Sequence, residues 1–83
     1  MSLTAVVLRI ADIYVPADRR REIDPERVAA TADEIMADAP ERPIQVRQGK
    51  GRYVLIKGVN RLEARKALGE TEIQAYIVSA RLH

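Results

Sequence analysis

The sequence lacks several residue types on which small proteins and many enzymes depend. Its 83 residues include no cysteine, no tryptophan and no phenylalanine, and the single histidine is the last residue, His83. Without cysteine, the chain cannot form a disulfide, a thiolate nucleophile or a zinc site built on cysteine ligands. One terminal histidine also excludes a serine–histidine couple and a multi-histidine metal site. Any catalysis must therefore use carboxylates, hydroxyls, arginine, lysine or a bound metal.

Long apolar runs are absent as well, since no segment approaches the ~20 apolar residues that cross a bilayer. Hydrophobic residues make up 47% of the chain and charged residues 31%, spread along its whole length. This composition favours a folded chain over a disordered one. A chain of this size has room for one core. We therefore expect residues 1–83 to form a single cytoplasmic domain with no membrane partner.

Basic residues concentrate in the second half of the chain. Residues 1–46 contain 6 basic and 9 acidic residues, whereas residues 47–83 contain 8 basic and 3 acidic residues. Most of the excess comes from Arg47, Lys50, Arg52, Lys57, Arg61, Arg65 and Lys66. Such a surface suits an anionic partner, either a nucleotide or DNA. A solvated basic surface with no partner explains the same composition equally well.

The hydrophobic pattern predicts five strands and two main helices. Apolar runs and alternations predict strands over residues 5–10, 13–15, 43–47, 52–57 and 73–78. Residues 17–22 show no periodicity and are expected to form a charged loop. Helical spacing over residues 25–38 predicts one buried stripe, formed by Val28, Ala32, Ile35, Met36 and Ala39. A second helix is predicted from Asn60 to about Leu68.

Local signals predict where these elements begin and end. Asp24 is expected to cap the first helix, with Pro25 at its first position and prolines at 40 and 43 ending it. Residues 48–51 predict the turn of a hairpin. Asn60 and Glu63 predict a capping box, and Gly69 suits the end of the second helix. The predicted order β-β-α-β-β-α-β corresponds to an α+β domain with a small mixed sheet.

The junction between the fourth strand and the second helix is the most informative segment for function. The strand ends at Gly58 and passes directly into a helix, so unpaired N–H groups and the positive end of the helix dipole meet at one point. Arg61 adds a planar fork of donors that matches phosphate oxygens. The residues predict an anion site formed by Gly58, Arg61 and the N–H groups of Val59, Asn60 and Leu62. The alternative is a tight turn beside a solvated arginine.

The order and spacing of these segments resemble the N-terminal domain of the ParB partition proteins, a member of the ParB/sulfiredoxin superfamily. The likeness covers roughly residues 6 to 78. It is carried by residues 13–15, Arg20 four residues before Asp24, the helix 25–38, and residues 43–46, 53–64, 68–69 and 73–78. The resemblance implies a ParB/sulfiredoxin-like fold and a nucleotide-binding domain.

The resemblance also implies a ligand and particular residues that contact it. In partition proteins the segment that resembles Gly58 to Ala64 is Gly-Glu-Arg-Arg-x-Arg-Ala, which holds the triphosphate of CTP with a magnesium ion. Gly58, Arg61 and Ala64 match this motif by position. Arg20 matches an arginine that reaches over from an early loop, with Arg19 and Arg21 as neighbouring candidates. The superfamily also includes serine kinases that use ATP, so CTP or ATP with magnesium is the implied cofactor.

Several positions depart from the family pattern. Val59 replaces the acidic residue of the motif, which puts metal-assisted hydrolysis in doubt, and Glu63 replaces its last arginine. Ala39 replaces a glycine that usually lies four residues before the matching proline. Asn60 stands where sulfiredoxins have histidine, and no cysteine precedes it. Sulfiredoxin chemistry is therefore excluded.

Three functions stay open. The first is a stand-alone ParB-like module that binds a nucleotide or phosphate, in chromosome or plasmid partition or another DNA-regulatory setting. The second is an enzyme, either a nuclease or a small phosphotransferase, with Glu22, Asp24 or Glu63 as a base. The third is a non-enzymatic DNA-associated factor that binds through the basic second half or residues 19–21. We expect no metal-binding cluster, and free sheet edges allow a homodimer.

Overall fold

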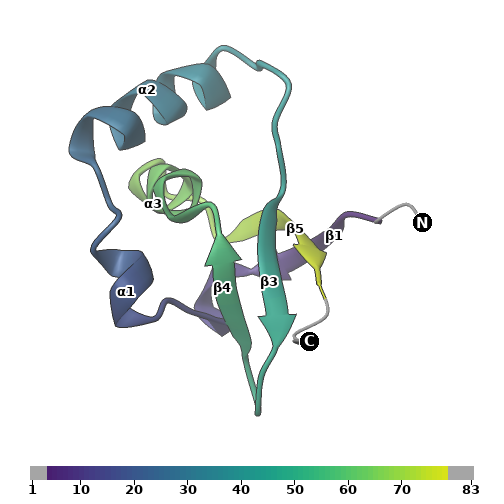
Figure 1. The fold of residues 1–83 in the computed structure, drawn as a ribbon. Coiled ribbons are helices and arrows are strands. Elements are labelled where there is room, and N and C mark those ends of the chain that lie inside the picture. The colour runs from purple at the N-terminus through teal and green to yellow at the C-terminus, as the bar shows by residue number, and fades with distance from the viewer. Residues whose placement is uncertain (1–3, 79–83) are drawn as a thin grey trace.

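The computed structural model describes residues 4–78, which form an α+β domain around one five-stranded sheet (Figure 1). The predicted fold class is confirmed. The strands are β1 (Val6–Arg9), β2 (Ile13–Tyr14), β3 (Ile44–Gln48), β4 (Tyr53–Lys57) and β5 (Glu72–Ile77). The helices are α1 (Ala17–Arg20), α2 (Pro25–Met36) and α3 (Val59–Ala67), with a short 3-10 turn, η1, at Ile10–Asp12.

The strands lie in the order β1-β5-β3-β4-β2. β3 and β4 form the predicted antiparallel hairpin, β1 is antiparallel to β5, and the β3–β5 and β2–β4 pairs are parallel. A register shift between Gln45 and Val46 leaves Gln45 opposite Lys57, while Val46 lies opposite Leu55. Because β5 pairs with β3, it lies beside the end of the sheet where β3 begins and β4 ends, although it is distant from both in sequence.

The core lies between one face of the sheet and α3. Leu62 and Val59 of α3 are buried with Ile44, Val46 and Leu55 of the central hairpin. From β5, Ile73 and Ala75 are buried, whereas Ile77, at the last position of the strand, is 39% exposed. Because α3 follows β4 after one residue, the same helix supplies core residues and the candidate site.

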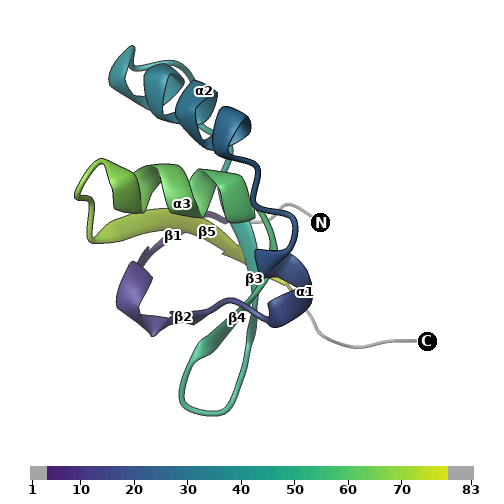
Figure 2. The same cartoon turned by 90° about the vertical axis from the view of Figure 1, so that its left-hand side faces the viewer.

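The helix α2 packs on α3, on the side away from the sheet (Figure 2). The predicted buried stripe on this helix is wrong. No residue of α2 is buried: Val28, Ala32 and Ile35 are half-buried, and the side chain of Met36 is 72% exposed. Ala39 lies beyond the helix and is exposed. The periodicity identified the face that packs, but a helix that rests on another helix at the surface buries less than one that rests on a sheet.

Residues 17–22 are not the predicted loop. The helix α1 occupies Ala17–Arg20, and a turn follows it. Pro16 stands before the first turn with a φ of −62°, and its carbonyl accepts hydrogen bonds from the amides of residues 19 and 20 at 3.0 Å. Four residues are too few to show an apolar period, which explains why the pattern missed this helix.

The predicted start of α2 is confirmed, but its predicted end is not. The Asp24 side chain accepts a hydrogen bond from the amide of Glu26 at 3.0 Å, and Pro25 is the first helical residue. The helix ends at Met36, where Asp38 adopts a φ of 62° and the amide of Ala39 bonds the carbonyl of residue 34. This left-handed C-terminal motif ends the helix before either proline acts.

The predicted capping box of α3 is wrong. Gly58 is the N-cap residue and Asn60 already lies inside the helix, so Asn60 cannot cap it. Glu63 instead forms an ion pair with Lys66 at 3.2 Å. The predicted end at Gly69 is confirmed, since Gly69 has a φ of 78° and follows the C-cap residue Leu68.

Candidate functional site

The candidate site begins at the single residue that joins β4 to α3. Gly58 has a φ of 107°, a conformation that other residues adopt rarely. A Cβ atom added there would lie 2.7 Å from Cγ2 of Ile44. Glycine is therefore required by its backbone conformation and by the packing of β3. The Cβ position faces Ile44, so the missing side chain makes room for β3 and not for a ligand.

Three backbone amides point out of the start of α3. The first hydrogen bond of the helix joins the amide of Leu62 to the carbonyl of Gly58 at 3.0 Å. The amides of Val59, Asn60 and Arg61 precede it and have no acceptor within the helix, so they are available to an anion. The predicted donor at Leu62 is wrong because its amide is used by the helix itself.

The side chains of the motif divide between the core and the surface. Val59, Leu62 and Ala64 are buried, at 4%, 1% and 0% exposed, so only the backbone of Val59 remains for a ligand. Ala64, which matches the family motif, contributes to packing under the helix. Glu63 is held by Lys66 on the outer surface. The site is therefore formed by the backbone of residues 58–61 and by the side chains that surround it.

Two cavities flank the start of α3, with volumes of about 420 and 400 Å³. Both are lined by Lys57, Gly58 and Arg61. The first cavity extends over the sheet end and is also lined by Arg42, Pro43, Ile44, Gln45 and Tyr76. The second extends toward α2 and is also lined by Glu22, Arg27, Thr31, Val59 and Asn60. We call the two cavities and residues 57–61 the junction site.

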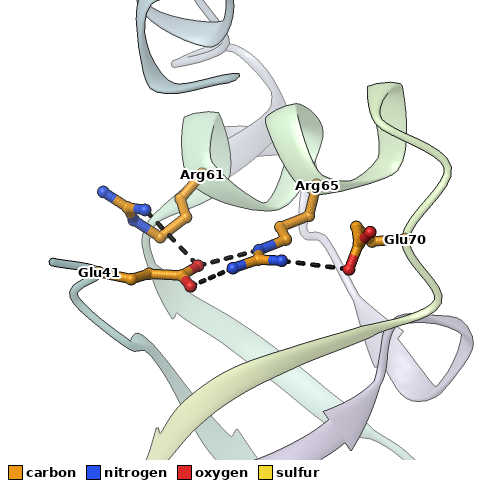
Figure 3. Close-up of polar contacts among 4 residues, drawn as sticks. All are labelled: Glu41, Arg61, Arg65 and Glu70. Atoms are coloured by element: carbon orange, nitrogen blue, oxygen red, sulfur yellow. Dashed lines mark hydrogen bonds and ion pairs between the residues drawn. The ribbon is translucent and has the colours of Figure 1, made fainter. Parts of the chain in front are cut away.

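Arg61 lies between the two cavities, with its guanidinium near a carboxylate. Its Nη1 atom is 3.6 Å from Oε2 of Glu41, longer than a hydrogen bond, and the two side chains are 18% and 17% exposed (Figure 3). The sequence-based interpretation of Arg61 as a fork for phosphate oxygens did not include this carboxylate. Glu41 holds one edge of the guanidinium, while Arg61 still lines both cavities.

Glu41 forms its stronger contacts with the next arginine along α3. Arg65 donates from Nε to Oε2 of Glu41 at 3.0 Å and from Nη2 to the other carboxylate oxygen, and its Nη1 bonds Glu70 at 3.2 Å (Figure 3). The hydrogen bond with Glu41 raises the pKa of Arg65, and Glu70 adds to this effect. Because Arg65 satisfies both oxygens of Glu41, the carboxylate only partly neutralises Arg61.

Asn60 connects the start of α3 to the segment before α2. Its side-chain oxygen accepts a hydrogen bond from the amide of Asp24 at 2.8 Å, and its Nδ2 contacts the carbonyl of Glu22 at 3.5 Å. This pair of contacts positions the first turn of α2 beside the second cavity. The side chain of Asn60 therefore holds the α2 side of the second cavity in place, and its backbone amide is available to a ligand.

The three early arginines lie on or next to α1. Arg20 is the last residue of this helix and is exposed, as is Arg21 after it. Arg19 donates to Glu22 at 3.0 Å. Within residues 4–78, neither cavity of the junction site is lined by any of the three. Contact between Arg20 and a bound phosphate stays a prediction.

Residues that the sequence did not single out complete the site. Arg27 and Thr31 come from α2, and Arg42 comes from the segment before β3. The spacing of Arg27 and Thr31 by four residues puts them on one helix face, which is a signal the sequence contains. Nothing local indicates that this face meets the start of α3. Arg42 reaches the site only because β3 lies beside β4.

The junction site carries more positive than negative charge. Lys57 and Arg61 border both cavities, Arg42 and Arg27 border one each, and Glu22 is the carboxylate among the lining residues. The other two candidate bases have structural partners, since Asp24 caps α2 and Glu63 pairs with Lys66. Among residues 4–78, no group of three acidic, histidine or cysteine side chains could hold a metal ion. This donor set fits phosphate oxygens and does not fit a magnesium ion held by the protein.

These features define an α+β domain with a basic strand–glycine–helix junction. The family model of the ParB N-terminal domain matches residues 3–82, and the chain belongs to this family. Comparison with curated proteins gives no match. Within the part of the chain that the structure describes, no helix has the length and apolar character needed to span a bilayer.

Solved structures share this fold. Sulfiredoxin from Arabidopsis thaliana is 30% identical with a TM-score of 0.81, and the match covers 93% of this chain and 86% of that chain. The truncated chromosome-partitioning protein ParB from Caulobacter crescentus, complexed with CTP-gamma-S, is 20% identical with a TM-score of 0.77, covering 94% and 46%. A free serine kinase in complex with AMP is 12% identical with a TM-score of 0.80, covering 95% and 32%. This chain thus spans less than half of the partitioning protein and about a third of the kinase.

Proposed function

We propose that this domain binds a nucleotide, with the phosphates at the start of α3. One observation carries the proposal: two cavities meet at Gly58 and share the side chains of Lys57 and Arg61. The amides of residues 59–61 point out of the helix at the same place. Backbone donors, the positive end of a helix and two cations together form a site for an anion with several oxygens.

The size and lining of the cavities favour a nucleotide over a lone phosphate ion. Each cavity has a volume of about 400 Å³, within the range of small-molecule sites. The first is also lined by Pro43 and Tyr76, both half-buried, which supply apolar surface beside the cations. A nucleotide combines both characters, because its phosphates are anionic and its base is flat and largely apolar.

Related proteins support this proposal by what they bind. The ParB of Caulobacter crescentus was solved with CTP-gamma-S, and the free serine kinase with AMP and with ADP. By analogy we propose CTP or ATP as the ligand, with any magnesium ion held by the nucleotide phosphates. A role in DNA partition or DNA regulation is the setting that we propose from the family.

Binding can be measured by calorimetry and by thermal unfolding with CTP, ATP, GTP and pyrophosphate, each with magnesium and with EDTA. A ligand at a hundredfold excess over its dissociation constant should stabilise the fold by about 2.7 kcal/mol. Arg61→Gln and Lys57→Gln should each raise the dissociation constant by about tenfold or more, since a hydrogen bond to a charged group contributes ~1.5–3 kcal/mol.

The matched control is Lys66→Gln, which removes a cation on the outer surface of the same helix, where Lys66 is 50% exposed. This variant should bind like the unmodified protein. The proposal fails if no nucleotide stabilises the domain at millimolar concentration, or if all three variants weaken binding equally. In the second case, the protein responds only to net charge.

A further inference from the structure

A second basic surface lies at the other end of the hairpin. Between Arg42 and Leu62 the sequence contains six basic residues and no acidic residue. This segment forms β3, β4 and the turn between them, which extends beyond the rest of the sheet at the end opposite Gly58 (Figure 1). Three of the six, Arg42, Lys57 and Arg61, belong to the junction site. The remaining three, Arg47, Lys50 and Arg52, have no role in the function proposed above.

Sheet pairing brings an aromatic ring into line with these residues. Tyr14 of β2 lies opposite Val54 of β4, and Val54 lies opposite Arg47 of β3. The neighbouring residues Ile13 and Tyr53 pack against the core under α3. Because side chains alternate along a strand, Tyr14 and Arg47 therefore lie on the face of the sheet away from α3.

Arg52 lies over the ring of Tyr14. The centre of its guanidinium is 4.0 Å from the ring centroid, the geometry of a cation–π contact. The Tyr14 side chain is 40% exposed, and Lys50 and Arg52 are exposed in and beside the turn. We call Tyr14, Arg47, Lys50 and Arg52 the hairpin face.

We infer that the hairpin face binds single-stranded nucleic acid. Three cations without an acidic neighbour in the segment provide the attraction to a phosphate backbone. The ring of Tyr14 and the planar guanidinium above it provide a flat surface on which a base can stack. Tyr14 and Arg47 are separated by one strand, or about 10 Å, so one short stretch of backbone can reach both.

The shape of the surface favours a single strand over a duplex. A protein usually reads duplex DNA by inserting a helix or a two-stranded ribbon into the major groove. The hairpin face instead presents Tyr14 of β2 and Arg47 of β3 on one side of the sheet, with Lys50 and Arg52 in the turn that precedes β4. A sheet surface with an exposed aromatic ring suits unpaired bases, which can leave the stack and lie against it.

Fluorescence anisotropy tests the inference with a labelled 15-nucleotide oligo-dT, a 15-base-pair duplex and poly-glutamate as competitor. The triple variant Arg47→Gln, Lys50→Gln, Arg52→Gln should bind the oligonucleotide at least about tenfold more weakly at low salt. The slope of log K against log salt should fall by about 2, because each lost phosphate contact removes ~0.7. Thermal unfolding shows whether the variant remains folded. Lys50→Gln alone, at an exposed turn position, should lower the slope by about 0.7.

Substitutions of Tyr14 distinguish the contribution of base stacking to oligonucleotide binding from the contribution of charge. Tyr14→Leu should weaken binding about fivefold or more with an unchanged salt slope, and Tyr14→Phe should restore it, because only the ring is needed. Lys66→Gln, a cation on the opposite side of the domain, should leave binding intact. CTP binding should be unaffected in the hairpin variants, so failure here does not affect the nucleotide proposal.

Three results would overturn the inference. The first is an oligonucleotide affinity of the triple variant, or of Lys50→Gln, that equals the affinity of the unmodified protein. The second is tighter binding of the duplex than of the single strand. The third is displacement of the oligonucleotide by poly-glutamate at equal charge concentration, which would mark a surface for anions in general.

Discussion

The two longer helices differ in how they are held. Three residues of α3 are buried, Val59, Leu62 and Ala64, whereas α2 has no buried residue. α3 lies between the sheet and α2, and α2 rests mainly on α3 (Figure 2). Burial of apolar side chains therefore stabilises α3 and contributes much less to α2.

Polar contacts hold both ends of α2. At its start, Asn60 accepts a hydrogen bond from the amide of Asp24. Beyond its end, Glu41 contacts Arg61 and Arg65 of α3. The junction site thus has one wall fixed by the core and one wall held by a few polar side chains. We expect the α2 wall, with Arg27 and Thr31, to open more readily than the wall formed by β4 and α3.

The largest expected effect is that of Leu62→Ala. This side chain is 1% exposed, and its loss leaves a cavity between α3 and the sheet. The substitution should lower the free energy of unfolding by about 3–5 kcal/mol, measured by urea unfolding. For a domain of this size, such a loss is a large share of the total stability. A decrease in the free energy of unfolding of less than about 1 kcal/mol would mean that packing of α3 on the sheet contributes little to the stability of the core.

Gly58→Ala tests how the core and the junction site depend on each other. The new Cβ would combine an unfavourable positive φ with a 2.7 Å contact to Ile44, for a cost of about 2–4 kcal/mol. Gly51→Ala is the matched control, since Gly51 has a φ of 74° and nothing within 4 Å of the added atom. The control should cost only about 1–2 kcal/mol. Equal costs at the two glycines would show that Ile44 moves aside freely.

Asn60→Ala tests the polar attachment of α2. Loss of the hydrogen bond to the amide of Asp24 should cost about 1–2 kcal/mol. Hydrogen exchange should become faster for amides of α2 than for those of α3, and nucleotide affinity should fall as the second cavity loses its wall. Asn60→Asp retains an acceptor for the Asp24 amide and should recover part of the protection. Uniform acceleration over both helices would contradict the difference between them.

The sequence predicted the strands well because their signals are local. Alternation in β1 and β3, the continuous apolar run of β4 and the glycine turn of the hairpin each lie within a few residues. Asp24 and Gly69 were also predicted correctly, since a cap depends on its neighbours along the chain. The depth of burial of α2 was not predicted because periodicity identifies a packing face without identifying its partner.

The candidate site was predicted only in part for a related reason. The junction at Gly58 and the position of Arg61 follow from consecutive residues. Glu41, Arg42 and Arg27 reach the site through pairing of β3 with β4 and packing of α2 on α3. Asn60 was predicted to cap α3, but it lies inside the helix. The helix starts earlier than predicted because Gly58, in the left-handed conformation, is its N-cap residue. Tertiary contacts of this kind leave no local pattern.

Met36→Ala should have the smallest effect and completes the comparison with Leu62. The Met36 side chain is 72% exposed at the last turn of α2, so its removal should change the free energy of unfolding by no more than about 0.5 kcal/mol. Alanine also has a higher helix propensity, which offsets part of any lost contact. A cost above about 1.5 kcal/mol, well outside the range for exposed positions, would show that Met36 is covered in solution. If that cost grew with protein concentration, a second copy of the chain would be the cover, and α2 would be an interface rather than a free surface helix.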